Sequence, residues 1–257
     1  MSKLNELAWR GLPEDGKKIV DGFKSSFVES SNTVFTTKKT FSPSKIVWGS
    51  GGCPRLWYFL FNGVHTTRTD SSFAKDNMQN GTDSHARMQK RLMDGPLDCE
   101  VERELTKESP PIRAFCDVVV ATEHDGLIPI EIKTAKDEAF AFRLVKFDPA
   151  SYHRLQLLFY MDILDAPYGF LMYENKNTYE KLLIPVFMDK ENREYLDKTL
   201  DWMRIVRKAY EEDTMPMYFK NRRSNSKICG DCEVRAHCDI VGEGKVMLPL
   251  LIKAQEA

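Results

Sequence analysis

The chain has 257 residues, of which 42% are hydrophobic and 29% are charged, proportions that exclude disordered, collagen-like and low-complexity proteins. Its 37 basic and 38 acidic side chains give a formal net charge of −1, so any nucleic-acid-binding surface would have to be local. No apolar run approaches the ~20 residues of a membrane span, and the first residues contain no apolar secretory core. These features predict a cytoplasmic protein without a membrane anchor.

The first third of the chain is predicted to contain loop and helix. Residues 1–45 are polar and are expected to form an exposed extension without regular structure. A Gly-Gly turn then precedes a short buried helix over residues 55–61. Residues 71–94 are expected to form an amphipathic helix, because His85 and two apolar side chains recur on one helical face.

The next region has the two-residue period of β-strands. Strands are predicted over 99–105, 112–121 and 127–133, with an Asp-Gly turn between the last two. The remaining predicted elements are a helix over 148–162, a hairpin of strands 168–173 and 178–187, and a helix over 189–213. This order predicts an α/β fold in which helices flank a mixed β-sheet.

Two acids and a lysine lie on adjacent strands of the first predicted hairpin. Glu131 and Lys133 share one strand face, because the isoleucines that alternate with them take the other. Asp117 stands within an apolar strand, where a carboxylate is costly unless it is paired or holds a metal ion. Two carboxylates suit Mg²⁺ or Mn²⁺, and a neighbouring lysine can orient a water molecule or neutralise charge. Taken alone, Glu-x-Lys is equally well explained by a surface ion pair.

Three polar positions on predicted helices and one on a strand extend this group. His85 could supply an imidazole ligand, but a lone histidine is more often a satisfied core residue. Gln156 and Tyr160 lie one turn apart on an apolar helix, as expected of residues that contact a phosphate or lie at the rim of the core. Glu102, in the first strand, is a weaker candidate.

The order and spacing of seven of these positions resemble the PD-(D/E)xK nucleases of the RecB type. The positions are His85, Asp117, Glu131, Ile132, Lys133, Gln156 and Tyr160. The resemblance implies a restriction-endonuclease-like fold, with a metal ion held by His85, Asp117, Glu131 and the backbone carbonyl of Ile132. It also implies that Lys133 is the catalytic lysine and that Gln156 and Tyr160 lie near the scissile phosphate or near Lys133.

Three cysteines lie close together near the C-terminus, at positions 229, 232 and 238. Such a group is typical of zinc or iron–sulfur ligands, and His237 could complete a local zinc site. Cys99 and Cys116 fall in predicted strands and are expected to be small core residues.

Cys53-Pro-Arg-x-x-Tyr58, together with these three cysteines, resembles the iron–sulfur nucleases of the CRISPR-associated Cas-four exonuclease family. The resemblance implies a 4Fe–4S cluster that closes the two ends of the nuclease domain and is held by Cys53, Cys229, Cys232 and Cys238. The nuclease domain is then expected over residues 46–243, followed by a tail over 244–257. The extension over 1–45 is longer than that family usually carries, which leaves open a phage-encoded or stand-alone recombination relative.

Two basic groups are candidate DNA contacts. The first, Lys220, Arg222 and Arg223, precedes the clustered cysteines. The second includes Arg87, on the same predicted helix as His85. A solvated loop explains the first group nearly as well.

Together the two resemblances imply a metal-dependent DNA exonuclease that acts on single strands or DNA ends, with 5′ to 3′ polarity. Recombination, repair or CRISPR adaptation is the expected setting, in a prokaryotic or phage-infected cell, as a homo-oligomer or within a larger complex. Two alternatives stay open: an endonuclease that trims DNA within a complex, and a non-catalytic nucleic-acid-binding module that contains zinc. The presence of Lys133 beside Glu131 argues against the second alternative.

Overall fold

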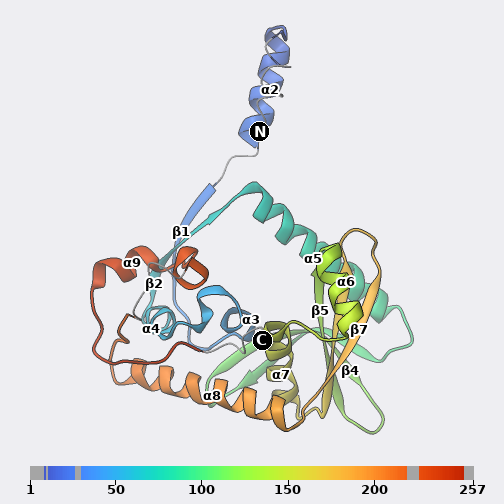
Figure 1. Cartoon of the computed structure of the whole chain (residues 1–257), viewed down its shortest axis with the longest axis vertical. Helices are drawn as coiled ribbons and strands as arrows, with labels where there is room; N and C mark the ends of the chain where they lie inside the picture. Colours follow the sequence, from blue (N-terminus) through green and yellow to red (C-terminus); the bar gives the residue numbers. More distant parts are fainter. Residues whose placement is uncertain (1–8, 10, 27–29, 219–225, 252–257) are drawn as a thin grey trace.

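The computed structural model describes residues 9, 11–26, 30–218 and 226–251. Within these residues, the body of the molecule is built on a five-stranded sheet in the order β3-β4-β5-β6-β7 (Figure 1). Neighbouring strands are antiparallel except for β5 and β6, which are parallel. The strands are β3 (Cys99–Lys107), β4 (Ile112–Ala121), β5 (Leu127–Ala135), β6 (Tyr168–Asn175) and β7 (Lys181–Phe187). The mixed sheet predicted from the sequence is therefore confirmed.

The hairpin of β4 and β5 opens near its base. Its turn is the predicted Asp-Gly turn, in which Gly126 adopts a φ of 77° that glycine reaches without steric cost. From the turn, backbone pairing extends as far as Val118 opposite Ile130. Asp117 and Glu131 follow just beyond the end of this ladder, so their side chains flank the point where the two strands stop pairing.

Helices cover both faces of the sheet. Parallel β5 and β6 need a crossover connection, which contains α6 (Asp137–Lys146) and α7 (Ser151–Leu164). On the opposite face lies α5 (Ser72–Met93), whose Met88 packs against Ile130 and Ile132. The sequence predicted α5 and most of α7, whereas α6 was missed because its single buried residue, Phe140, gives no helical apolar period.

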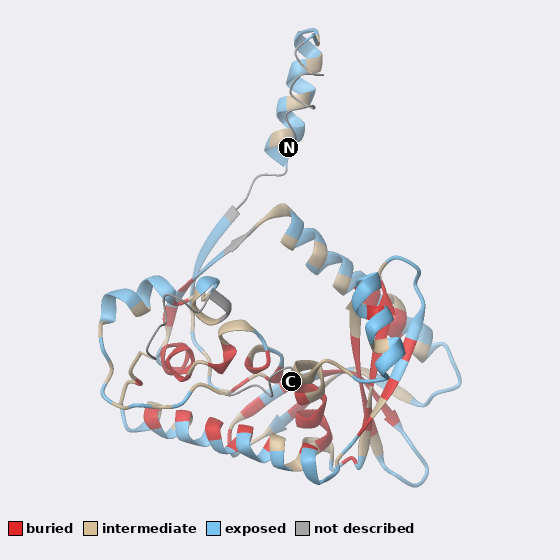
Figure 2. Cartoon of the chain, in the orientation of Figure 1, coloured by how far each residue is buried: buried red, intermediate tan, exposed pale blue. Residues whose placement is uncertain are grey.

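The prediction that residues 1–45 lack regular structure is wrong. They include α2 (Glu14–Ser26) and β1 (Ser30–Thr36), and β1 pairs with β2 (Val64–Asp70) in an antiparallel ribbon. The ribbon carries α2 away from the body, and α2 contains no buried residue (Figures 1 and 2). The two strands escaped sequence analysis because most of their side chains are polar and the alternation that marks a half-buried strand is absent.

A second group of helices lies beside the sheet. The short elements α3 (Pro43–Ile46) and η1 (Gly49–Gly52) lead into α4 (Pro54–Asn62), which is buried along nearly its whole length (Figure 2). The long helix α8 (Lys190–Glu211) runs beneath α4 and the sheet (Figure 1). The chain then returns to the N-terminal end of α4 through η2 (Ser226–Gly230) and α9 (Arg235–Val241). In the described part of the chain, no helix combines the length and apolarity needed to cross a bilayer.

Candidate active site and cysteine centre

Asp117 and Glu131 are both buried where β4 and β5 separate, with 8% and 2% of their surfaces exposed. The Ile132 N–H donates to Oδ2 of Asp117 at 2.7 Å, so this carboxylate takes the place of the missing strand partner. Nδ1 of His85, from α5, lies 3.3 Å from the other oxygen of Asp117. The hairpin and α5 therefore bring together the side chains that the sequence singled out as metal ligands.

Glu131 is the centre of a polar network on the α7 face of the sheet. Its Oε1 accepts hydrogen bonds from Nζ of Lys133 and, at 2.6 Å, from Nε2 of Gln156. The same Gln156 nitrogen donates to the hydroxyl of Tyr160 at 2.7 Å. Gln156 and Tyr160 are both buried, so they do not lie at the rim of the core; Gln156 bonds Glu131 directly, and Tyr160 is linked to it through Gln156.

The charges and the burial around Glu131 favour the binding of a cation to its carboxylate. Burial raises the pKa of this carboxyl, the neighbouring Asp117 carboxylate raises it further, and Lys133 opposes both effects. Its second oxygen, Oε2, is buried and has no hydrogen-bond partner among the residues that the structure describes. A buried unpaired oxygen beside a second carboxylate is the donor chemistry that hard divalent cations such as Mg²⁺ and Mn²⁺ prefer.

Gln89 is a site residue that sequence analysis missed. From α5, its Nε2 donates to Oε1 of Glu102 at 2.6 Å and to the backbone carbonyl of Asp117 at 3.0 Å. Glu102 has a φ of 51°, and the pairing of β3 with β4 skips it opposite Asp117. Backbone strain of this kind costs ~1–3 kcal/mol and often marks a functional site. Gln89 lies one helical turn after His85, and this spacing is the sequence feature that could have predicted its position beside the site.

His153 and Tyr173 form a second missed pair. Tyr173 lies opposite Lys133 in the β5–β6 register, and its hydroxyl is 2.9 Å from Nδ1 of His153 on α7. Burial, followed by the charges of Lys133 and Arg143, lowers the pKa of His153 to about 2. The imidazole is therefore neutral at physiological pH. His153 stands one turn before Gln156, on the same helix.

Of the four candidate DNA-contact residues, the structure describes one, Arg87. Arg87 donates to Glu174, a carboxylate with no exposed surface, and its guanidinium lies 5.1 Å from the centre of the Tyr179 ring. The charge of Arg87 therefore balances a buried acid, and its contact with DNA stays a prediction. Lys220, Arg222 and Arg223 lie outside the described residues.

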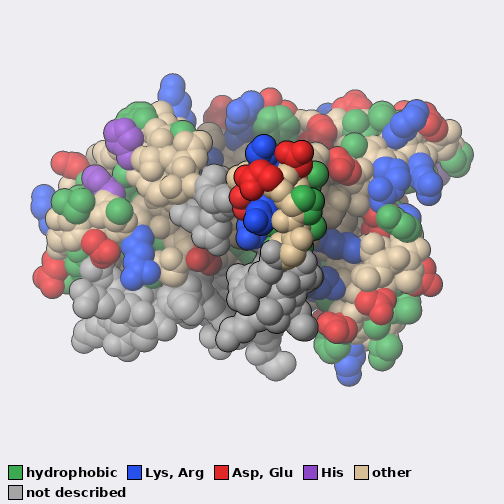
Figure 3. Space-filling view, turned by 90° about the horizontal axis from the view of Figure 1, so that it is seen from above, with side chains coloured by type: hydrophobic (Ala, Val, Ile, Leu, Met, Phe, Trp, Pro, Cys, Tyr) green, Lys and Arg blue, Asp and Glu red, His purple; other side chains and the backbone are tan. Residues whose placement is uncertain are grey.

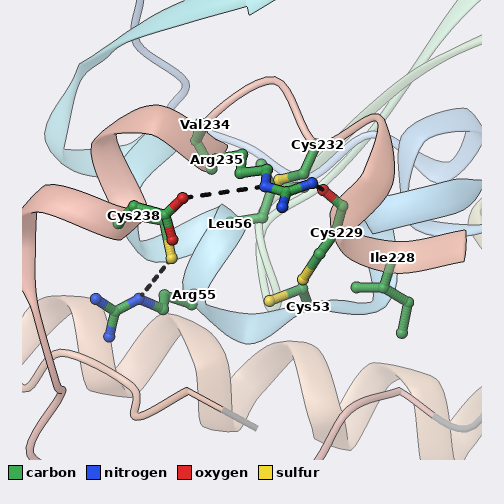
Figure 4. Close-up of a pocket in the computed structure, with 10 residues that line it drawn as sticks. Cys53, Arg55, Leu56, Ile228, Cys229, Cys232, Val234, Arg235 and Cys238 are labelled. Carbon is green, nitrogen blue, oxygen red and sulfur yellow. Dashed lines mark hydrogen bonds and ion pairs between the residues drawn. The ribbon is translucent and has the colours of Figure 1, made fainter. Parts of the chain in front are cut away.

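The four cysteines singled out in the sequence line one cavity of about 50 Å³ (Figure 4). None of the four forms a disulfide with another described cysteine: Cys53, Cys229, Cys232 and Cys238. Burial raises the pKa of Cys53 to about 12, while hydrogen bonds from the backbone N–H groups of Leu56 and Arg55 act in the opposite direction. Such N–H donors stabilise a thiolate, which is the form of cysteine that binds metals.

His237 does not line this cavity; its ring packs edge-on against Phe59, with 4.8 Å between the ring centres. Four thiols rather than three thiols and an imidazole therefore share the space, and soft sulfur ligands fit either zinc or an iron–sulfur centre. The other two cysteines lie elsewhere: Cys116 is fully buried in β4 and Cys99 is half-buried in β3. Among the described residues, no group of three or more His, Cys, Asp or Glu side chains has a geometry that could hold a metal ion. This applies both to the carboxylate site and to the cysteine cavity.

Comparison with solved structures finds matches that include the following three. The structure described as SSO0001 has 17% sequence identity, a TM-score of 0.45, and an alignment that covers 87% of this chain and 93% of that one. The alkaline exonuclease LHK-Exo from Laribacter hongkongensis has 13% identity and a TM-score of 0.43, with 52% and 71% covered. LHK-Exo in complex with dAMP has the same identity and TM-score, with 68% and 89% covered.

Comparison at the level of sequence identifies the family. No curated protein matches the chain. Residues 96–239, more than half of the sequence, match the PD-(D/E)XK nuclease superfamily. The matched segment includes the polar residues of β4, β5 and α7 that meet at Glu131: Asp117, Glu131, Lys133, Gln156 and Tyr160. The chain therefore belongs to the PD-(D/E)XK nuclease superfamily.

Proposed function

We propose that this protein is a metal-dependent DNA exonuclease that acts on single strands or DNA ends, with 5′ to 3′ polarity. The observation that carries the proposal is the buried group of Asp117, Glu131 and Lys133, in which one Glu131 oxygen has no hydrogen-bond partner within the described part of the chain. A group of this kind is costly to the fold unless a ligand completes it.

Each residue of the group has a distinct role in the proposal. His85, Asp117, Glu131 and the carbonyl of Ile132 would hold Mg²⁺ or Mn²⁺, which when bound polarises a phosphate and lowers the pKa of a water molecule. Lys133 would orient the attacking water or stabilise negative charge on the phosphate. Gln156 and Tyr160 would hold Glu131 in position, since Gln156 bonds both the carboxylate and the Tyr160 hydroxyl.

The four cysteines would hold a 4Fe–4S cluster with a structural role. The proposal is supported by the cavity that the four thiols share and by the position of His237 outside it. The cluster would join the start of α4 to the segment around α9, two regions far apart in the sequence. Recombination, repair or CRISPR adaptation, alone or within a complex, is the proposed setting.

The substrate would be bound by local contacts. On the face of the molecule shown in Figure 3, acidic and basic side chains of the described residues are interspersed. The net charge of −1 likewise gives no reason to expect strong attraction of DNA to the protein as a whole.

Degradation of end-labelled linear single-stranded DNA tests the proposal. We expect activity with Mg²⁺ or Mn²⁺, none with EDTA, and a loss of ~10²–10³-fold for Lys133→Ala, because one electrostatic catalytic group is removed. The control is Lys208→Ala, which changes an exposed lysine on α8 and should retain full activity.

The same assay separates the alternatives. Cleavage of circular single strands at a comparable rate would identify an endonuclease. Activity of Lys133→Ala equal to that of the parent protein would refute the assignment of the active site. Absence of any nuclease activity, with stoichiometric zinc in a colourless protein, would identify a binding module.

A further inference from the structure

The side chain of Arg55 is buried in the wall of the cysteine cavity, with only 2% of the residue exposed. Its Nε donates to Sγ of Cys238 at 3.1 Å (Figure 4). Its two terminal nitrogens donate to the backbone carbonyls of Pro216, at 2.7 Å, and Gly242. The guanidinium thus bonds one cysteine and two backbone positions that are far apart in the sequence.

These two carbonyls precede and follow the segment that carries three of the four clustered cysteines. We define the cysteine loop as a described part of this segment, residues 226–241. The base of the segment is also closed by a bridge between Pro216 and Val246, with the Met217 N–H donating to the Val246 carbonyl at 2.7 Å. Because Arg55 belongs to α4, it ties both ends of the segment to a buried helix of the body.

The charge of Arg55 adds a second consideration. The guanidinium lies 4.2 Å from the centre of the Tyr218 ring and 5.1 Å from that of Phe59, and no carboxylate among the described residues forms an ion pair with it. An arginine side chain stays protonated even when it is buried, and a buried cation without an anion is costly. Thiolates of a metal-bound cysteine centre would supply the missing negative charge.

We propose that Arg55 is the positioning residue of the cysteine centre: it clamps the base of the cysteine loop to α4, and it compensates the negative charge of the thiolates. By holding the base of the loop against α4, the clamp would keep Cys229, Cys232 and Cys238 next to Cys53. This inference does not depend on whether the metal is zinc or an iron–sulfur cluster.

The test uses the full-length protein as purified and measures two quantities. The first is the rate at which N-ethylmaleimide labels each cysteine, resolved by mass spectrometry. The second is amide hydrogen exchange in the cysteine loop and, separately, in β5. The variants are Arg55→Lys, which keeps the charge but loses the forked donor geometry, and Arg55→Gln, which loses both.

We expect both variants to label Cys238 about tenfold faster than the parent protein, since a charge-assisted hydrogen bond and two backbone anchors are lost. Exchange should rise in the loop and stay unchanged in β5. Gly244→Ala is the positive reference, because a Cβ there would lie 2.2 Å from the Pro216 carbonyl oxygen and force the base open while Arg55 stays intact. Arg235→Gln is the matched control, because Arg235 lines the same cavity but its side chain is 51% exposed.

Two outcomes would overturn the proposal. One is a parent-like labelling rate and loop exchange in both Arg55 variants while Gly244→Ala opens the loop. The other is an equal rise of exchange in β5 and in the loop, which would make Arg55 a general core residue. Metal analysis of the parent protein reports separately on the proposed cluster, so absence of iron would reject the cluster and leave the clamp to be judged by exchange and labelling.

Discussion

At the scale of single residues, burial decides what each polar group of the site can do. Glu131 and Lys133 are two residues apart on one strand face, and if both were exposed to solvent they would form an ordinary surface ion pair. In the fold Glu131 is 2% exposed, beside Asp117 and against α7, so its carboxylate depends on Lys133 and Gln156 for compensation. The same burial keeps His153 neutral between two cations.

We expect His153→Asn to make the protein less sensitive to acid. Between pH 6.5 and 5, the unfolded imidazole takes up a proton while the folded one, with its pKa near 2, does not, so the unfolded state binds more protons. Stability should then fall with falling pH by up to ~1.4 kcal/mol per unit, a loss that the variant avoids. Urea unfolding at several pH values between 7 and 5 measures it.

The control for this prediction is His124→Asn, which changes an exposed side chain in the turn between β4 and β5. Its stability should follow the parent protein at every pH. Parallel curves for His153→Asn and the parent protein would mean that folding does not lower the pKa of His153.

At the scale of elements, close backbone approaches fix the region around the cysteine cavity. A Cβ at Gly51, in η1, would lie 1.7 Å from the backbone oxygen of Lys45. The Gly51 carbonyl also accepts a hydrogen bond from the indole of buried Trp57 at 2.8 Å. This turn therefore admits only glycine, and it holds α3 directly against the start of α4.

Two alanine substitutions test the geometry of these elements. Gly51→Ala should destabilise the protein by about 3 kcal/mol or more, because the backbone must move to relieve the clash. Gly81→Ala, in the middle of α5 with no atom within 4 Å of the added Cβ, should stabilise it by ~0.5–1 kcal/mol. Denaturant unfolding gives both values, and destabilisation by Gly81→Ala to the same extent would contradict this description of α5.

At the scale of the whole molecule, the cysteine centre joins distant parts of the chain. We expect Cys53→Ser and Cys229→Ser to lose the brown colour and the iron together and to lower the melting temperature by similar amounts. A cross-link that closes a loop of this length stabilises by ~4–5 kcal/mol, by analogy with a disulfide. Cys99→Ser, in β3 outside the cavity, should match the parent protein.

Iron analysis, the visible spectrum and thermal unfolding check this expectation. Stoichiometric zinc, with Cys53→Ser indistinguishable from the parent protein, would instead indicate a local zinc site. The comparison of Cys53 with Cys229 is informative because the two side chains lie next to each other in the cavity but come from segments far apart in the sequence (Figure 4).

Local pattern predicted much of the fold. The two-residue period predicted β4 over its full length. The helical period predicted the ends of α5 and α8 to within a few residues. The helices α5 and α8 each bury one face, so their sequences show the helical period, whereas β4 is buried on both faces from Cys116 to Val120. By contrast, β1, β2 and α6 bury too little for such a pattern, and only their tertiary setting reveals them.

The sequence by itself determined which polar residues share a face of β5 and of α7, because the strand and helix periods fix the side on which each side chain lies. Glu131 shares a face with Lys133, and Gln156 shares one with Tyr160. Only the tertiary structure decided that Gln89 bonds the backbone of Asp117 and that His153 pairs with Tyr173, since these partners come from other parts of the chain. Likewise, no local pattern links Arg55 to Cys238 or to the carbonyls of Pro216 and Gly242. Those contacts exist because α4 is buried against the returning C-terminal segment. A buried charged side chain is costly unless it is hydrogen-bonded, and the available acceptors come from segments distant in the sequence.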